Sequence, residues 1–336
     1  MENLLSSLSI TIFVGILALL AQWSRKSRRA EISLWVVILF LSLLALATGL
    51  LLGAVSLNGQ VPADVYPPWL LAFTTGAVAA AGLIGLGLCV PTLRKIVSRR
   101  PNDGFWSDPP TFLALWLFVT VLLANNLVGI LGFEQLERIG AFSLATGGRV
   151  SPGVILASQL PFIAVALLGV GLGVRRSPRE TLSRLGYGPI CLKHLGVVAL
   201  FVGAAFALSL ATDYLFSQLQ PDLYREVGRV SRALFDPRGL DPVSAVLFAL
   251  LIGVGAGLGE ETLFRGAVQP VLGVLPTSIL FASMHVQYGP SLLLGYIFLL
   301  SIGLGLLRRY INTTASFLAH AGYNTLSVLA AYFLAT

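Results

Sequence analysis

Runs of about 20 consecutive apolar residues recur along almost the whole chain, and they restrict the fold more than any other feature. An α-helix of that length spans the hydrocarbon core of a bilayer. Hydrophobic residues make up 56% of the chain and charged residues only 11%, which is typical of a polytopic membrane protein. The sequence therefore predicts an all-α, membrane-embedded helical bundle with about ten apolar segments. These cover residues 4–22, 32–56, 68–90, 111–132, 151–174, 195–216, 241–268, 276–288, 290–307 and 314–335, of which 276–288 is short for a full span.

The basic residues predict the orientation of these segments. Of the 22 Lys and Arg residues, 15 fall in alternate loops, around 25–29, 94–100, 175–193 and 308–309, while six fall in the opposite loops and one, Arg265, lies within a helix. Loops rich in Lys and Arg face the cytoplasm. We therefore expect both termini outside, in a membrane that is most simply a bacterial inner membrane. The net charge of +7 is a topology signal with some attraction to lipid headgroups, so no nucleic-acid partner is expected.

Polar connections suggest how the segments are grouped. The proline-rich linker at 91–110 predicts a division into N-terminal membrane helices with a cytoplasmic linker (1–110), a linking helix and loop (111–149) and a C-terminal core (150–336). The first run carries no preceding cation, which predicts a retained helix and not a cleaved signal peptide. Residues 217–240 have apolar side chains at helical spacing, which favours a surface amphipathic helix over a lid. Cys89 and Cys191 predict neither a disulfide framework nor a cysteine metal site.

Small and amide residues within the apolar segments have simple structural interpretations. Glycines at 253, 255, 257 and 259 open no strand-to-helix turn, so close helix packing explains them better than a dinucleotide loop. Asn125 and Asn126 are adjacent in the fourth segment. Hydrogen bonding between helices is their expected role.

A cluster of polar residues in the last hundred positions has no such simple explanation. A charged group at bilayer depth costs about 2.5–3.5 kcal/mol on insertion scales, so several together indicate a buried reaction site. The cluster consists of Glu260, Glu261, Arg265, His285, His320 and Asn324.

The spacing of these residues predicts which of them form ion pairs and which are available for catalysis. Glu261 and Arg265 are four apart and share a helix face, so we expect an ion pair. Glu260 is rotated by about 100° and is left for proton chemistry, although an ion network that only holds helices together is the alternative. His320 and Asn324 are also four apart, and helix-to-helix hydrogen bonding is the alternative for them and for His285. Together, carboxylate and imidazole form a general base for water, and imidazole with carboxamide stabilises an oxyanion.

Three motifs in this cluster resemble those of a known family. EETLFR (260–265), FASMH (281–285) and HAGYN (320–324) match the EExxxR, FxxxH and HxxxN motifs of the CPBP intramembrane proteases, which include Rce1-type CAAX prenyl endopeptidases and the bacteriocin-processing and immunity (Abi) proteins. The resemblance covers residues 150–336 and implies a catalytic core in the C-terminal helices. It implies that Glu260 and His285 activate water, that His320 and Asn324 form the oxyanion hole, and that Glu261 and Arg265 support the site.

The resemblance also implies a reaction without a cofactor. A zinc ion held by Glu260, His285 and His320 is the alternative, since these would supply three ligands and leave one open position. The sequence has neither the HExxH nor the GxGD motif of other intramembrane proteases.

Three functions fit these observations. The leading one is an intramembrane endopeptidase, with CAAX-type activity possible, that cleaves a peptide or membrane-protein substrate within the lipid bilayer. A non-proteolytic scaffold or bacteriocin-immunity-type binding protein would keep the fold without needing Glu260 or His285. A transporter or proton relay using the same carboxylates would give ion-dependent flux and no cleavage product.

Overall fold

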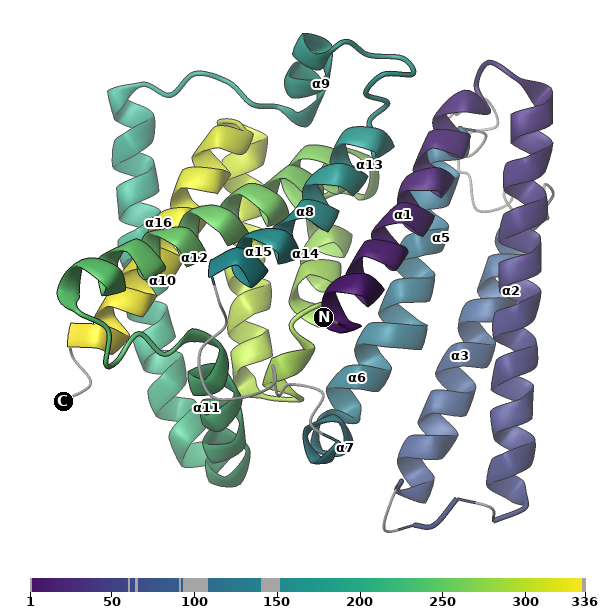
Figure 1. The fold of residues 1–336 in the computed structure, drawn as a ribbon, viewed down its shortest axis with the longest axis horizontal. Coiled ribbons are helices and arrows are strands. Elements are labelled where there is room, and N and C mark those ends of the chain that lie inside the picture. The colour runs from purple at the N-terminus through teal and green to yellow at the C-terminus, as the bar shows by residue number, and fades with distance from the viewer. Residues whose placement is uncertain are drawn as a thin grey trace. The chain divides into compact units, whose positions relative to one another are not determined.

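The computed structural model describes residues 2–59, 61–63, 66–90, 92, 108–139 and 152–333. Within these ranges the chain is all-α, with one isolated bridge between Leu172 and Arg176 (Figure 1). The predicted all-α fold class is therefore confirmed. Most of the predicted linker at 91–110 lies outside the described residues.

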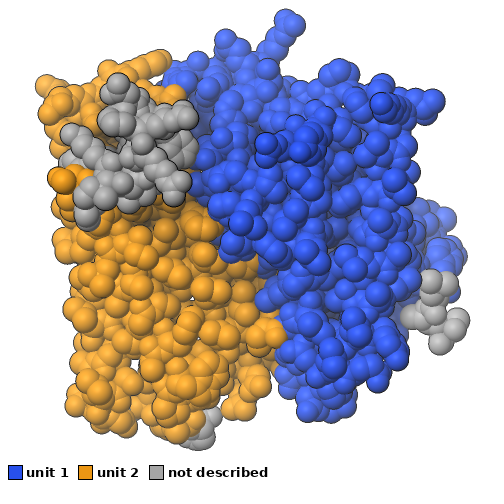
Figure 2. All heavy atoms as spheres, turned by 180° about the vertical axis from the view of Figure 1, so that it is seen from behind, with its two compact units in different colours: residues 1–15, 141–282, 291–336 blue, residues 16–140, 283–290 orange. Residues whose placement is uncertain are grey.

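The chain forms two compact units (Figure 2). Unit 1 comprises residues 1–15, 141–282 and 291–336, and unit 2 comprises residues 16–140 and 283–290. Unit 1 contains the first part of α1 (Glu2–Trp23), α8 (Pro152–Gly169), α9 (Pro178–Leu185), α10 (Leu192–Leu219), α11 (Pro221–Phe235), α12 (Pro242–Glu261), the π-helix η2 (Thr262–Val268), α13 (Gln269–Leu272), nearly all of α14 (Val274–Ser283), α15 (Leu292–Tyr310) and α16 (Thr313–Phe333). Unit 2 contains the rest of α1, α2 (Arg28–Leu57), α3 (Pro68–Cys89), α5 (Pro109–Val121), the π-helix η1 (Leu122–Leu127), α6 (Val128–Leu131), α7 (Phe133–Arg138) and the 3₁₀ turn η3 (Val286–Tyr288).

Helices occupy all ten of the predicted apolar stretches, but the predicted number of spans is not confirmed. Six described helices are long and apolar enough to cross a membrane: Arg28–Leu57, Pro68–Cys89, Pro109–Leu131, Leu192–Leu219, Pro242–Leu272 and Leu292–Tyr310. The apolar helices Leu8–Trp23, Gly153–Gly169 and Val274–Ser283 are shorter. A helix of 10 residues, such as Val274–Ser283, covers about half of the hydrocarbon core, at a rise of about 1.5 Å per residue.

The glycines of α12 allow close packing against α16 and α8. A Cβ added at Gly253 would lie 2.5 Å from the carbonyl oxygen of Ala321, and one added at Gly257 would lie 3.2 Å from the Ala321 Cβ. The predicted packing role is confirmed at these positions. It is wrong at Gly255, where an added Cβ would find its nearest neighbour at 3.9 Å, because this glycine faces a looser part of α8.

Residues 221–235 form the amphipathic helix α11, as the spacing predicts. Val227 and Val230 are buried, and Leu223 and Leu234 are half-buried, so the apolar stripe faces the protein. Asp222, Arg225 and Arg229 are exposed on the other side.

Unit 2 is held by an apolar core between its long helices. Leu17, Leu34, Ile38 and Phe112 are buried in this core. A buried hydrogen bond adds to it, since Trp116 Nε1 donates to Ser42 Oγ at 3.0 Å. Such a bond satisfies an indole N–H that has no water to bind at this depth.

Candidate active site

The two adjacent glutamates lie where helix α12 changes its winding. Glu261 is the last residue of the α-helix, and residues 262–268 continue as the π-helix η2. Single π-helical turns inside α-helices occur frequently at functional sites. Both carboxylates therefore occur next to an irregular turn of an otherwise regular membrane helix.

Glu261 forms the centre of a buried charged network. Its Oε2 lies 3.2 Å from Arg265 Nε, and both side chains are 0% exposed. Its Oε1 lies 2.9 Å from His320 Nδ1 on α16. The ion pair predicted from the four-residue spacing is thus confirmed, and the same carboxylate also binds His320.

Two residues without a predicted role complete the surroundings of this network. Ser301 on α15 accepts from Arg265 Nη2 through its backbone carbonyl at 3.3 Å and through its Oγ at 3.1 Å. The ring of Phe281 on α14 lies 4.7 Å from the Arg265 guanidinium and edge-on to the His320 ring, at 5.8 Å between centroids. Phe281 is the first residue of the FASMH motif, which explains in part why that position is aromatic.

Glu260 differs from Glu261 in forming no ion pair with a described residue. The side chain is half-buried, and its Oε2 is buried without a hydrogen bond from any described residue. Asn324 lies one turn beyond His320 on α16 and is also half-buried. The buried Oε2 of Glu261 also lacks a hydrogen bond, but it is ion-paired with Arg265, whereas Glu260 forms no ion pair with any described residue.

His285 belongs to unit 2 and not to a helix. The apolar segment predicted at 276–288 is α-helical only as far as Ser283, so His285 lies beyond the end of the α-helix. The backbone of His285, at φ −87° and ψ 53°, lies outside the helical region and leads into the 3₁₀ turn Val286–Tyr288. Its half-buried ring stacks on Tyr288, with 6.0 Å between centroids and 9° between planes.

The loop before α10 is fastened to the start of α16 by several hydrogen bonds. Thr314 Oγ1 donates to the carbonyl of Gly188 at 2.8 Å, and Asn312 Nδ2 donates to the carbonyl of Pro189 at 3.0 Å. The Tyr187 hydroxyl bonds to Thr262 Oγ1 in η2 at 2.6 Å. Burial raises the pKa of Tyr187, so the phenol stays neutral at physiological pH. This loop therefore ties together the two helices that carry Glu261 and His320.

No three His, Cys, Asp or Glu side chains come together as a metal site in the part of the chain that the structure describes. The reaction without a metal therefore stays a prediction, with zinc as its alternative.

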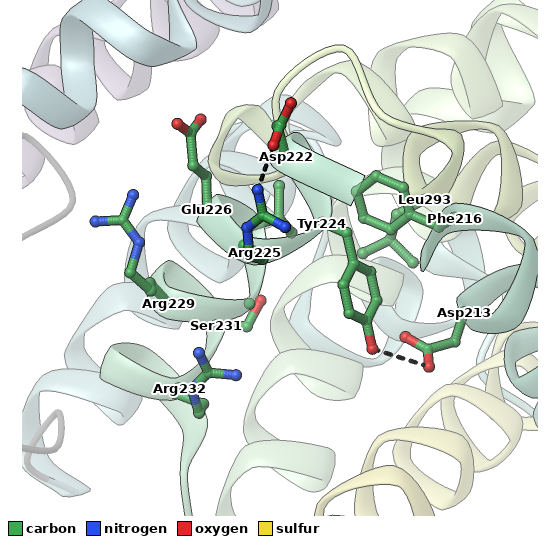
Figure 3. Close-up of a pocket in the computed structure, with 12 residues that line it drawn as sticks. Asp213, Phe216, Asp222, Tyr224, Arg225, Glu226, Arg229, Ser231, Arg232 and Leu293 are labelled. Carbon is green, nitrogen blue, oxygen red and sulfur yellow. Dashed lines mark hydrogen bonds and ion pairs between the residues drawn. The ribbon is translucent and has the colours of Figure 1, made fainter. Parts of the chain in front are cut away.

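A surface pocket of about 680 Å³ lies between the end of α10 and α11 (Figure 3). Tyr224 donates to Asp213 there at 3.3 Å, and Arg225 pairs with Asp222. None of the predicted site residues lines this pocket. Its lining includes the exposed charged residues Asp222, Arg225 and Arg229, whereas Glu261 is fully buried.

Comparison with known proteins identifies part of the chain. Residues 242–326 match the family model for type II CAAX prenyl endopeptidase Rce1-like proteins. The match covers α12 to most of α16 and so includes all six predicted site residues. No curated protein and no solved structure matches the chain.

Proposed function

We propose that this chain is a membrane-embedded peptidase, as its similarity to the Rce1-like CAAX endopeptidases over residues 242–326 supports, and that it hydrolyses peptide bonds with water activated by Glu260 and His285. The observation that supports this assignment is the difference between the contacts of the two glutamate side chains. Glu261 is engaged by both Arg265 and His320, whereas the buried Oε2 of Glu260 has no hydrogen-bond donor among the described residues. Because Glu260 has no positively charged ion-pair partner among the described residues, we assign it the proton taken from water.

In the proposed reaction, Glu260 removes a proton from the water whose oxygen attacks the scissile carbonyl carbon. His285 assists by orienting that water through its imidazole. The electron pair of the carbonyl π bond moves onto the carbonyl oxygen, which becomes the oxyanion of the tetrahedral intermediate. Collapse of this intermediate reforms the carbonyl and breaks the C–N bond, and the proton held by Glu260 passes to the leaving amine.

His320 and Asn324 are proposed to stabilise the oxyanion. Because His320 Nδ1 faces Glu261, the ring's Nε2 is the nitrogen available to substrate, and in a protonated imidazole it is a hydrogen-bond donor. The Asn324 carboxamide supplies a second donor one turn along α16. Removing a donor of this kind typically costs a hundred- to a thousandfold in kcat, or about 2.7–4 kcal/mol.

Arg265, Ser301 and Phe281 are proposed to hold Glu261 and His320 in place without touching substrate. The guanidinium is fixed by the carboxylate, by Ser301 and by the Phe281 ring. A rigid support of this kind lets the oxyanion donors be oriented before the reaction starts.

The substrate class follows from the membrane setting. We propose a peptide, leader or membrane-protein tail that is cleaved near the cytoplasmic face of a bacterial inner membrane. CAAX-type cleavage of a prenylated peptide is one reaction of this class.

The decisive experiment compares cells that express the wild type with cells that express Glu260→Gln. Membrane and peptide fractions are scored by mass spectrometry for new termini, and Glu134→Gln, an exposed glutamate on α7, is the matched control. Termini that appear with the wild type and Glu134→Gln but not with Glu260→Gln support the proposal. Normal cleavage by Glu260→Gln would rule out Glu260 as the base, and identical profiles for all three proteins at equal accumulation would favour a scaffold or binding role.

A further inference from the structure

A buried asparagine in unit 2 reaches the segment that carries His285. Asn126 is 1% exposed and lies in η1, the π-helical part of the helix Pro109–Leu131. A carboxamide buried among apolar helices needs hydrogen-bond partners, because it has no water to bind. The π-helix η1 thus carries polar side chains, as the π-helix η2 does next to the glutamates.

The hydrogen bonds of Asn126 fix the orientation of its side chain. Its Nδ2 donates to Ser283 Oγ at 2.8 Å, and its Oδ1 accepts from Asn125 Nδ2 at 2.9 Å. Ser283 is 6% exposed and is the last residue of α14, two positions before His285. The bond therefore holds the chain at the point where the helix ends and the His285 segment begins.

Two close packing contacts extend the same attachment beyond His285. A Cβ added at Gly129 would lie 2.8 Å from Val286 Cγ1, so Val286 packs directly on the backbone of α6. Gly289 has φ +53°, and a Cβ added there would lie 2.9 Å from Phe133 Cγ. Three successive contacts thus hold this segment: Asn126 with Ser283, Gly129 with Val286, and Phe133 with Gly289. Residues 126, 129 and 133 follow one another at intervals of three and four.

We propose that Asn126 is a positioning residue for His285, acting through Ser283. The proposal rests on the catalytic role proposed for His285, and it gives the helix Pro109–Leu131, which lies outside the family match, a part in the reaction. Held on both sides, the non-helical backbone of His285 has little freedom to move its imidazole. Loss of the bond would let that imidazole shift, and misplacement by about 1 Å costs on the order of a hundredfold in rate.

The test uses the full-length protein, purified in detergent, and a quenched fluorescent peptide spanning the cleavage position found in the Glu260→Gln comparison. Ser283→Thr and Ser283→Val have nearly equal volumes, but only threonine keeps the hydroxyl. We expect Ser283→Thr to stay within about threefold of wild-type kcat. We expect Ser283→Val and Asn126→Leu each to lose roughly tenfold to a hundredfold in kcat with KM nearly unchanged. The Asn126→Leu, Ser283→Val double variant should be no slower than Asn126→Leu alone, because both changes remove the same bond between Asn126 and Ser283.

Ser42→Ala is the matched control, because it removes another buried hydrogen bond to the same long helix, the one from Trp116. It should lower the melting temperature while leaving kcat within twofold of wild type. Equal losses of kcat in Ser42→Ala and Asn126→Leu would overturn the inference in favour of a general stability effect, as would wild-type kcat in Ser283→Val. His285→Ala separates the two proposals. If it is fully active, the proposed role of His285 fails as well, and if it is inactive while Asn126→Leu is normal, only the positioning role fails.

Discussion

At the scale of single residues, the burial of Glu261 determines what its neighbours tolerate. This carboxylate is 0% exposed and is balanced by Arg265 and His320. A buried ion pair adds little stability compared with an apolar pair, but removing one partner leaves an unpaired charge in a medium of low polarity. Substitutions around Glu261 should therefore affect folding before they affect chemistry.

Arg265→Ala should destabilise the protein by about 3–5 kcal/mol, because it leaves the buried Glu261 carboxylate with His320 as its one remaining partner among the described residues. Arg265→Lys should lose less, since it keeps the charge but not the two bonds to Ser301. Unfolding in detergent micelles measures both. The control is Arg309→Ala, an exposed change expected to alter stability by about 0.5 kcal/mol or less. Equal stability of Arg265→Ala and wild type would contradict a charged Glu261.

Asn324→Ala should lower kcat by roughly a hundred- to a thousandfold if the carboxamide donates to the oxyanion, with little change in melting temperature. The matched change is Asn312→Ala at the start of α16, which removes bonds to Pro189 and to the Ala315 N–H. It should cost about 1 kcal/mol of stability, as cap losses do, and leave kcat near normal. If Asn324→Ala shows the second pattern, its role is hydrogen bonding between helices.

Residue-level predictions from the sequence succeeded where the interaction is local. The four-residue spacing of Glu261 and Arg265 was enough to predict their pair, because a helix places such residues on one face. The bond from Glu261 to His320 joins residues 59 apart in the chain, and no periodicity reports on such a contact. Ser301 and Phe281 were missed for the same reason, since one serine or one phenylalanine in an apolar helix carries no signal of its own.

At the scale of helices, small residues set how closely α12 approaches α16. Gly253→Ala should destabilise the protein by about 1–3 kcal/mol, because the new methyl group meets the Ala321 carbonyl oxygen at 2.5 Å. Gly255→Ala, on the same helix, has room and should be neutral or stabilising by up to about 1 kcal/mol. Melting temperatures of the two variants give the comparison. A larger loss for Gly255→Ala would mean that α12 is rotated from the orientation described.

Helix positions were predictable and helix irregularities were not. Long apolar runs predict helices well because a membrane helix satisfies its own backbone. The π-helices η1 and η2 are mostly apolar like the α-helices around them, and a few polar residues in an apolar run do not predict a change of winding. The end of α14 at Ser283 was missed because the apolar run continues past it as far as Val286.

At the scale of the whole molecule, the positive-inside pattern makes a prediction about sidedness. Cys191 is exposed in a loop predicted to be cytoplasmic. In a Cys89→Ser background, an impermeant maleimide should label it in inside-out vesicles but not in right-side-out vesicles. Gln218→Cys in a Cys89→Ser, Cys191→Ser background, exposed at the far end of α10, should show the opposite pattern. Labelling of Cys191 in right-side-out vesicles would reverse the predicted topology.

The pairing of Glu261 and Arg265 within one helix also affects how the protein is made. A nascent helix leaves the translocon before later helices are synthesised, and each isolated charge would oppose its partition into lipid by about 2.5–3.5 kcal/mol. Because the two charges lie one turn apart on the same segment, they neutralise each other before Ser301 or His320 has been synthesised. We therefore expect this pair to ease the biogenesis of the helix first and to support the finished site afterwards.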